Sequence, residues 1–377
     1  MRVFFLLHAS NKYGAGRSVL AMIEGLVRRG VKCYCLLPEK GPLQQEFEAL
    51  GVEYRILRLP RWVSENNNLP LTVLRLAVNF FLIVPIALMA SRWRADLFFS
   101  TSSVIPAGAF AAFLSRKPHI WQIREFVEED YQMHFDLGGD FSRKIIGIFS
   151  KKVIFVSKAL SLKYSSFVDK HKNIVIYNQI SLDNAEALEC HPNIYGQLAT
   201  LVGRIHPGKG QEEAVRAVSF LKKQGINLQL NIVGDGDAIH TNSLIQLVHE
   251  QGVDDRVRFF GFVSTPSCLI RSSNLLLVCS HSGALDRVVI EGMLCEVPVV
   301  VARGGGNQEV IDDGITGLLY TPGDYQDLAL KIKAILENPK LARNISEKAK
   351  IWATEKFDGR HCSEKVFELL EETLTCK

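Results

Sequence analysis

The most informative segment of this 377-residue chain is "LATLVGRIHPGKGQEEAVRAV", residues 198–218. It begins with a short apolar run typical of a buried strand, passes through a glycine-containing loop and continues with helical periodicity. A second apolar run, "LQLNIVG" at 228–234, follows. A strand, a crossover helix and another strand predict one unit of a parallel sheet covered by helices.

The same alternation of apolar runs and helical patterns extends through the whole chain, from "RVFFLLH" near the start to "GLLY" at 317–320. The polar stretch 181–197 interrupts it and is predicted to be a linker. We therefore expect an α/β protein with two doubly wound, Rossmann-like domains, at residues 1–180 and 198–355. A closing helix at 356–377 is expected to pack back toward the first domain. Ligands of such sheets bind beyond the carboxyl ends of the strands, which predicts a site in a cleft between the domains.

Composition and charge narrow the class of protein. The chain is 47% hydrophobic and 22% charged, which excludes a disordered protein. Its net charge is only +4, but residues 1–180 hold 24 Lys and Arg against 14 Asp and Glu. Residues 181–377 hold 20 against 26. The basic first half indicates an anionic partner, and a membrane surface, a phosphorylated lipid or a nucleic acid would each satisfy it.

One segment, "LPLTVLRLAVNFFLIVPIALMASRW" at 69–93, approaches the length of a membrane-spanning helix. Arg75, Asn79 and Pro85 interrupt it, so the favoured expectation is a helix buried within the first domain. A helix lying on a membrane interface is the second alternative and a spanning helix the third.

The cysteines and the first residues favour a cytoplasmic protein. The eight cysteines show no CxxC pair and no metal-ligand spacing, and several lie in apolar runs, which predicts buried free thiols. The opening "MRVFFLLHAS" is too short in its apolar part for a signal peptide and is predicted to be a buried strand.

Two glycine turns have the form of anion-binding loops. Gly14 and Gly16 open a helix after the first strand, where backbone N–H groups favour an anion, but Val19 replaces the third glycine of a dinucleotide fingerprint. In the second domain, Gly203 and Arg204 follow a strand and Lys209 precedes a helix, so two cations can converge on one phosphate group. Two solvated surface charges are the alternative.

The stretch "HSGALDRVVIEGMLCEVPVVVA", residues 281–302, places a lone carboxylate, Glu291, in an apolar helix that begins near Arg287. The helix start can bind a phosphate, and Glu291 can accept hydrogen bonds from two ribose hydroxyls or pair with a neighbouring cation. Asp286 is predicted to cap this helix, with a role as sugar ligand as the alternative. Further glycine turns occur in "NIVGDGDA" and "RGGGNQEVI".

In this order and spacing, the motifs resemble glycosyltransferase family 4, a group of retaining enzymes with the two-domain GT-B fold. The resemblance covers nearly the whole chain and is carried by "YGAGRSVLAMIEGLVRRG", "VGRIHPGKG", "VGDGD", "DRVVIEGMLCEVPVV", "GGGNQEVI" and "DDGITGLLY". It implies a glycosyltransferase of hexosyltransferase type that needs no metal and no cofactor beyond a nucleotide-sugar co-substrate. It also implies a saccharide or lipid-linked acceptor held by the first domain, a role in polysaccharide or glycolipid synthesis, and no nucleic-acid partner. The implied location is the cytoplasm, with peripheral contact to the inner membrane face.

The resemblance assigns roles to particular residues. Arg204 and Lys209 would bind and stabilise the leaving diphosphate, Glu291 would hold the ribose, and Arg124 in "WQIREF" aligns with the family's catalytic-region His. The donor-binding set that it implies is Gly14, Gly16, Gly203, Gly234, Gly283, Asp286, Arg287, Gly305 and Gly306.

Two positions depart from the family pattern. Gly283 stands where the family has a first Glu that contacts the transferred sugar, and Asp286 stands where it has a Gly. Because the first Glu is missing, a catalytically degenerate relative that only binds a nucleotide or a partner is the main alternative. A nucleotide-sugar epimerase of similar architecture is a further one. The sequence does not identify the base or the sugar of the donor.

Overall fold

The computed structural model describes residues 1–65, 68–180, 196–357 and 359–375. The chain divides into two compact units. The first comprises Met1–Gln179 and Gly359–Lys377, and the second comprises Ile180–Asp358. Most of the expected linker, 181–195, lies outside the described residues, and residue 197 already begins a strand.

The first unit is built on a seven-stranded sheet in which every neighbouring pair is parallel. The strand order is β3-β2-β1-β5-β6-β8-β9. In that order the strands are Glu53–Ile56, Lys32–Leu37, Arg2–Leu6, Leu97–Ser100, His119–Ile123, Lys152–Phe155 and Asn173–Val175. Strands β5 and β6 are buried at every residue, as expected for central strands covered on both faces.

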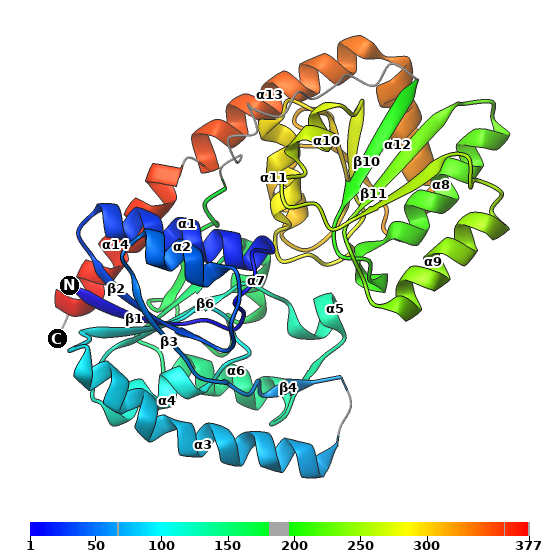
Figure 1. Cartoon of the computed structure of the whole chain (residues 1–377). Helices are drawn as coiled ribbons and strands as arrows, with labels where there is room; N and C mark the ends of the chain where they lie inside the picture. The colour runs from blue at the N-terminus through cyan, green and yellow to red at the C-terminus, as the bar shows by residue number, and fades with distance from the viewer. Residues whose placement is uncertain (66–67, 181–195, 358, 376–377) are drawn as a thin grey trace. The chain divides into compact units, whose positions relative to one another are not determined.

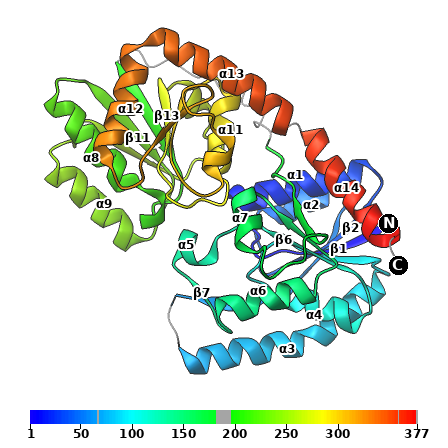
Figure 2. The same ribbon diagram turned by 180° about the vertical axis from the view of Figure 1, so that it is seen from behind.

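Helices cover both faces of this sheet (Figures 1 and 2). On one face lie α1 (Gly14–Arg28), α2 (Leu43–Ala49) and α14 (Gly359–Thr375), with α14 in contact with α1. On the other lie α3 (Leu69–Arg92), α4 (Ala107–Leu114) and α6 (Gly139–Ile148). The short helices α5 (Val127–Tyr131) and α7 (Lys158–Lys163) and an antiparallel pair, β4 (Val63–Ser64) and β7 (His134–Phe135), complete the unit.

The second unit has a six-stranded parallel sheet in the order β12-β11-β10-β13-β14-β15. In that order the strands are Val257–Gly261, Leu228–Val233, Gln197–Val202, Leu275–Val278, Val299–Ala302 and Leu318–Tyr320. Helices α8 (Gln211–Lys223), α9 (Ala238–Glu250) and α12 (Tyr325–Glu337) pack their apolar sides on one face, around a core that includes Leu230 and Leu277. Helices α10 (Ser267–Arg271), α11 (Arg287–Leu294) and α13 (Pro339–Phe357) lie on the other face (Figure 1). Both units are doubly wound, which confirms the predicted fold class.

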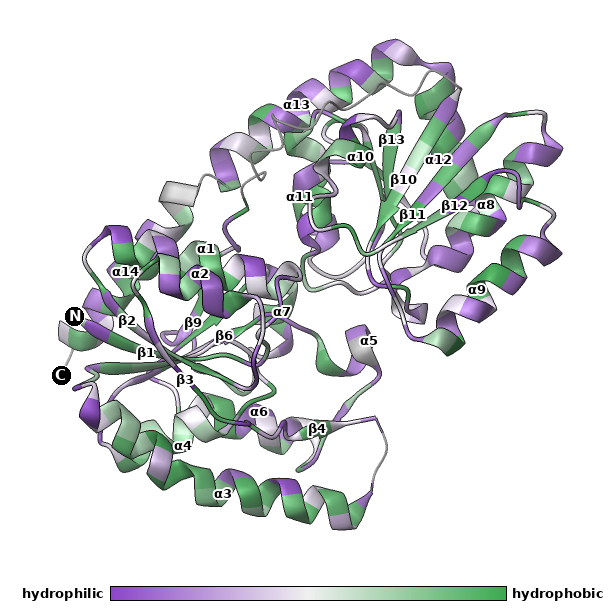
Figure 3. Ribbon diagram, in the orientation of Figure 1, coloured by the Kyte–Doolittle hydropathy of each residue, from purple (hydrophilic) through white to green (hydrophobic). Residues whose placement is uncertain are grey.

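The apolar segment at 69–93 is where the favoured expectation is wrong. It forms α3, which Asn68 caps by accepting a hydrogen bond from the Leu71 amide at 3.3 Å. Only Asn79, Ile86 and Ala90 of this helix are buried, so it is not a core helix. Most of its residues are hydrophobic (Figure 3). By length and composition α3 is able to cross a membrane.

The cysteines follow the expectation in part. Cys33, Cys35, Cys279, Cys295 and Cys362 are free and buried. Cys268 is disulfide-bonded instead, so the prediction of a free thiol is wrong at that position.

Candidate active site

The loops that follow β10, β11 and β13 in the second unit pack backbone against backbone. A Cβ at Gly210, which has φ +66°, would lie 2.3 Å from the carbonyl oxygen of Cys279. A Cβ at Gly234 would lie 2.1 Å from the carbonyl oxygen of Gly203. Only glycine allows these approaches. The glycine spacing therefore brings the ends of three strands together.

Lys209, at the end of the 3₁₀ turn η2 (Pro207–Lys209), is held by Asp286. Its Nζ lies 2.6 Å from Asp286 Oδ1, and Asn307 Nδ2 donates to Asp286 Oδ2 at 2.9 Å. Burial alone would raise the pKa of Asp286, but Lys209 and hydrogen bonds from Asn307 and Ser280 lower it below its ordinary value. The site thus contains a partly buried ion pair between the loops after β10 and β13.

The cap predicted for α11 is not formed by the Asp286 side chain. Asp286 occupies the N-cap position, but its carboxylate makes no capping hydrogen bond. It turns instead to Lys209 and Asn307, and the Asp286 amide donates to Asn307 Oδ1 at 2.7 Å. The prediction of a simple cap is therefore wrong, because the charged partner competes successfully for the carboxylate.

Gly283 lies directly against this ion pair. A Cβ at Gly283 would be 2.6 Å from Asp286 Oδ2 and 2.8 Å from Asn307 Nδ2. The glycine loop after β14 is closed in the same way, because a Cβ at Gly305 would lie 2.4 Å from the Gly283 carbonyl oxygen and the Gly306 amide donates to that oxygen at 2.8 Å. Position 283 thus has no room for a larger side chain while Asp286 holds this conformation.

Glu291 is buried in the second turn of α11. Arg287, one turn earlier and also largely buried, donates to Glu291 Oε1 from NH2 at 3.3 Å. This is the pairing with a neighbouring cation that the sequence left open. The predicted role of Glu291 toward a ribose stays a prediction.

Arg204 lies on the exposed side of the loop after β10. Burial and the charges of His240, Arg204 and Lys209 together lower the pKa of His206. Arg204 and Lys209 lie on the same short loop on either side of His206, and both of their charges act on it. The charge of Arg204 is available in solvent next to Gly203.

The remaining predicted residues belong to the first unit. Gly14 and Gly16 open α1, and a Cβ at Gly16 would lie 1.9 Å from the Asn11 carbonyl oxygen. Arg124 follows β6, donates to Gln122 Oε1 at 2.7 Å and reaches the Ala15 carbonyl oxygen at 3.3 Å. Arg124 and the first glycine turn therefore share one site in this unit.

Sequence reasoning missed several polar residues that the structure places in these networks. Glu125 is buried and accepts hydrogen bonds from Ser102 and Ser103. In the second unit Asn307 holds Asp286, and Glu213 binds His281. The one signal in the sequence is polarity at positions where the helix and strand patterns call for apolar residues, as at Glu213 beside "AVRAV".

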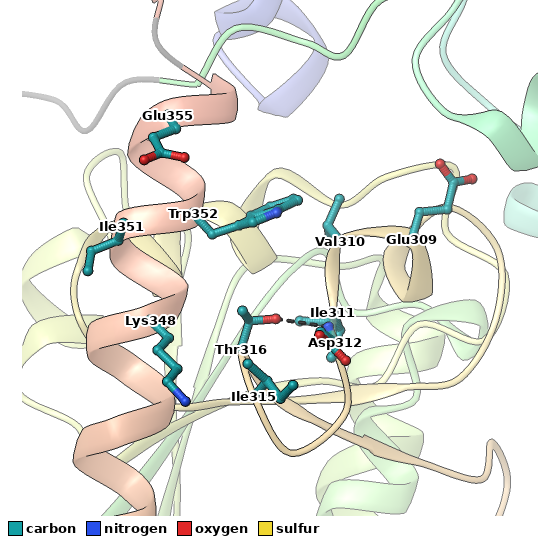
Figure 4. Close-up of a pocket in the computed structure, with 10 residues that line it drawn as sticks. All are labelled: Glu309, Val310, Ile311, Asp312, Ile315, Thr316, Lys348, Ile351, Trp352 and Glu355. Carbon is teal, nitrogen blue, oxygen red and sulfur yellow. Dashed lines mark hydrogen bonds between the residues drawn. The ribbon is translucent and has the colours of Figure 1, made fainter.

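A separate hollow of about 510 Å³ lies between residues 309–316 and α13 (Figure 4). Its described lining includes Trp352, Ile351, Lys348 and Thr316. None of the predicted site residues is among these lining residues. The hollow is therefore distinct from the network around Lys209.

Comparisons with known proteins agree with this architecture. Residues 196–352 match the family model for group 1 glycosyl transferases. An uncharacterized glycosyltransferase of Methanocaldococcus jannaschii is 27% identical over 279 residues, 71% of this chain and 73% of that protein. The N-acetyl-alpha-D-glucosaminyl L-malate synthase of Bacillus anthracis is 34% identical over 149 residues, which are 40% of this chain and 38% of that protein.

Solved structures match over the full length. HepE of Anabaena, solved in complex with UDP-glucose, has a TM-score of 0.80 at 22% identity, covering 99% of this chain and 100% of that one. Sucrose-phosphate synthase of Thermosynechococcus elongatus has a TM-score of 0.79 at 18% identity and covers both chains fully. These likenesses establish the fold, and the family match lies on the unit that carries Lys209 and Asp286. The chain is a glycosyltransferase of the GT-B fold, and its residues 196–352 match the family model for group 1 glycosyl transferases.

Proposed function

We propose that the protein transfers a sugar from a nucleotide-diphosphate-sugar to a saccharide or lipid-linked acceptor, with retention of configuration and without a metal ion. The observation that carries this proposal is Lys209, whose ammonium is fixed 2.6 Å from Asp286 at the end of three parallel strands. With the exposed Arg204 on the same loop, Lys209 supplies a second cationic hydrogen-bond donor where doubly wound sheets bind their ligands.

In this reaction the two cations stabilise the diphosphate that leaves. Charge develops on the leaving oxygen in the transition state, and donors positioned in advance lower the barrier because they need no reorganisation. Arg204 and Lys209 supply the charge that a divalent ion supplies in other transferases. Glu291 holds the ribose, Arg124 acts near the acceptor, and the glycine turns admit the backbone close to the donor.

The donor is tested with a thermal-shift panel of UDP-, GDP- and ADP-sugars. HepE binds UDP and UDP-glucose, so UDP-glucose is the first compound to try. Stabilisation by one nucleotide class identifies the base, because a ligand at 100 times its Kd raises stability by about 2.7 kcal/mol. No stabilisation by any member would contradict the donor site.

A second assay separates the transferase from its alternatives. Gly283 is the specific observation that favours a protein that binds without transfer, because it leaves the family's sugar-contacting position without a side chain. We expect donor turnover only when an acceptor is added. Turnover without acceptor that changes only the sugar would indicate an epimerase, and binding with no turnover across an acceptor panel would indicate the degenerate relative.

We also propose that the protein acts at the cytoplasmic membrane surface through one face of its first unit. Helices α3, α4 and α6 cover the same face of the sheet, and all three carry exposed large apolar side chains. These are Leu69, Leu71, Val73, Leu74, Val78, Phe80, Phe81, Val84 and Leu88 on α3, Phe113 and Leu114 on α4, and Phe141 and Ile148 on α6. Exposed apolar side chains gathered on one face mark sites that contact a partner or a membrane.

Charge around this apolar face fits an anionic lipid surface. Between Leu69 and Ile123 the chain has five basic residues and Asp96 as its single acidic one. Arg92, Arg94, Arg116 and Lys117 are exposed near the carboxyl ends of α3 and α4. Because Arg75 pairs with Asp136 of the same unit and Ile86 and Ala90 are buried in it, α3 lies along the unit and is expected to rest in the membrane interface.

Vesicle flotation tests this attachment. We expect the protein to float with vesicles of phosphatidylglycerol and phosphatidylcholine more than with phosphatidylcholine alone, and less as salt rises, because salt screens exposed charges. Equal recovery in the unbound fraction with both lipids would contradict the proposed attachment.

A further inference from the structure

A buried carboxylate in the second unit anchors the loop that carries Gly283. Glu213 lies in the first turn of α8 and is 8% exposed. The Tyr320 hydroxyl donates to its Oε2 at 2.9 Å and the Gly323 amide donates to the same atom at 3.1 Å. Its Oε1 binds His281 Nε2. Burying a carboxylate costs free energy unless its oxygens accept hydrogen bonds, as those of Glu213 do. These bonds therefore hold Glu213 and its partners in a defined arrangement.

His281 is fixed at one ring nitrogen and open at the other. Its side chain is 44% exposed, and in the part of the chain that the structure describes its Nδ1 makes no hydrogen bond. Its backbone is held as well, because the loop after β14 approaches so closely that a Cβ at Gly304 would lie 2.3 Å from the His281 carbonyl oxygen. The ring is therefore oriented before any ligand arrives, with Nδ1 left for a partner.

The groups around Glu213 determine which ring nitrogen carries a proton. Glu213 Oε2 accepts from Tyr320 and Gly323, and Oε1 is left to accept from His281, so we assign the proton of this contact to His281 Nε2. The hydrogen bond and charge of Glu213 raise the pKa of His281. Tyr320 and Cys279, the other titratable groups of the cluster, stay neutral because burial raises the pKa of each. The charge in the cluster is thus confined to Glu213 and His281.

We propose that His281 contacts the sugar of the donor through Nδ1, and that Glu213 is the positioning residue that orients it. This inference rests on the proposed function. His281 lies two residues before Gly283, and Asp286 lies three residues after it. Asp286 is bound to Lys209 and Asn307, whereas Nδ1 of His281 makes no hydrogen bond among the described residues. In this loop His281 therefore supplies a hydrogen-bonding group that Gly283 lacks, directed at a sugar hydroxyl.

Two substitutions separate contact with the sugar from support of the loop. In His281→Asn the side-chain amide lies near the place of Nδ1 and the bond to Glu213 is lost. In His281→Gln the amide reaches the place of Nε2, keeps Glu213 satisfied and leaves the Nδ1 position empty. A sugar contact predicts that Asn retains function better than Gln, and a purely structural role predicts the reverse order.

The measurement compares a nucleotide sugar with its free nucleoside diphosphate. The probe pair is UDP-glucose and UDP, or the pair that the panel above identifies, with each Kd measured by calorimetry. We expect His281→Gln to raise the Kd for UDP-glucose at least tenfold and to leave the Kd for UDP unchanged. The Kd of His281→Asn for UDP-glucose should stay within about threefold of the wild-type value. Melting temperature should fall in His281→Asn, which leaves Glu213 with one donor fewer, and change little in His281→Gln.

Other results would overturn the inference. If His281→Gln binds UDP-glucose as tightly as wild type, His281 does not contact the sugar. If it loses affinity for UDP and UDP-glucose equally, His281 contacts the diphosphate instead. Glu213→Gln is the positioning control: its amide no longer fixes the proton of His281 on Nε2, so we expect the binding of UDP-glucose to weaken more than that of UDP. A wild-type protein that no nucleotide sugar stabilises would instead be a failure of the proposed function, which the same panel shows separately.

Discussion

Lys209 and Arg204 lie on the same loop of the second unit but differ in their structural role. Lys209 neutralises Asp286, whose side chain is mostly buried, whereas Arg204 projects into solvent. Removing one partner of a buried ion pair leaves an uncompensated charge, and removing an exposed charge does not. The two residues therefore have the same role in the proposed chemistry, but Lys209 contributes more than Arg204 to the stability of the fold.

Alanine at either position tests this difference. We expect Arg204→Ala and Lys209→Ala each to lower kcat/KM by roughly 10²–10³, because each removes a donor to the leaving diphosphate. Lys209→Ala should also lower the free energy of unfolding by about 1–3 kcal/mol, and Arg204→Ala should leave it unchanged. Near-normal turnover in both variants would refute the diphosphate site.

Gly283 and Asp286 form a second residue-level pair, and their identities are linked by space. Where the family pattern has Glu and then Gly, this chain has Gly283 and Asp286. A Cβ at 283 would lie 2.6 Å from Asp286 Oδ2, so a side chain at 283 and this carboxylate exclude each other. In either arrangement the loop contains one carboxylate and one glycine.

Restoring the family residues one at a time tests this link. Gly283→Glu should lower the melting temperature because its Cβ collides with Asp286 and Asn307. Gly283→Glu combined with Asp286→Gly should melt higher than Gly283→Glu alone, which a double-mutant cycle measures as a favourable coupling. Additive effects of the two changes would show that the positions are independent.

The glycines and cations of the site could be predicted from the sequence, because their spacing indicates where strands end and helices begin. The side chains that pair with them could not be predicted. Asp286 looked like a cap because it precedes a helix, but its carboxylate binds Lys209, 77 residues away in the chain. Glu213 and His281 are 68 residues apart. Pairings across loops depend on sheet order, which no local pattern specifies.

Among the elements, α3 departs most from its sequence-based interpretation. Its interruptions by Arg75, Asn79 and Pro85 suggested a helix held inside the domain. Arg75, near the start of the helix, donates to Asp136, and the Asn79 side chain donates to the Arg75 carbonyl oxygen, so neither polar residue prevents the rest of the helix from facing outward. An apolar helix with few charges does not reveal from sequence whether protein or lipid covers it.

The aromatic residues of α3 allow a direct test of the proposed membrane contact. Phe80 is 69% exposed and Phe81 is 74% exposed. Replacing both with Ser should abolish flotation with anionic vesicles and lower the melting temperature little, because most of each side chain is exposed. The matched control is Ile239→Ser on α9, which is 80% exposed in the second unit and should float like wild type. A double variant that floats normally would exclude α3 as the contact.

Strand β6 begins with a buried histidine that makes the first unit sensitive to acid. Burial lowers the pKa of His119 to about 3, and its Nε2 lies 2.9 Å from Ser100 Oγ of β5. The unfolded chain takes up a proton below about pH 6.5 and the folded chain does not until about pH 3, so stability falls as pH falls through that window. We expect His119→Gln to reduce this dependence, by at most about 1.4 kcal/mol per pH unit in urea unfolding. An unchanged slope would contradict the assignment.

At the scale of the whole molecule, alternation of strands and helices was sufficient to predict two doubly wound units, because buried parallel strands are recognisable as continuous apolar runs. The place of the last helix depends on a finer feature. Helix α14 returns to the first unit and packs on α1, with Val366, Leu369 and Leu370 in the core of that unit. The two helices approach closely at Gly25, where a Cβ would lie 2.5 Å from the Cβ of Ser363.

This close approach predicts that the two units can be destabilised separately. Gly25→Val would force α14 away from α1 and uncover apolar core, so the transition of the first unit in scanning calorimetry should move to lower temperature. The midpoint temperature of the second unit's transition should not change, and it should still rise when a nucleotide sugar is added. The reason is that Lys209 and its partners lie wholly in that unit. Glu24→Val, one position earlier, is the control: among the described residues Glu24 pairs only with Arg28, on the surface, and loss of this pair costs little. If Gly25→Val melts like Glu24→Val, α14 does not depend on the glycine contact, and the first unit holds its last helix by the apolar residues alone.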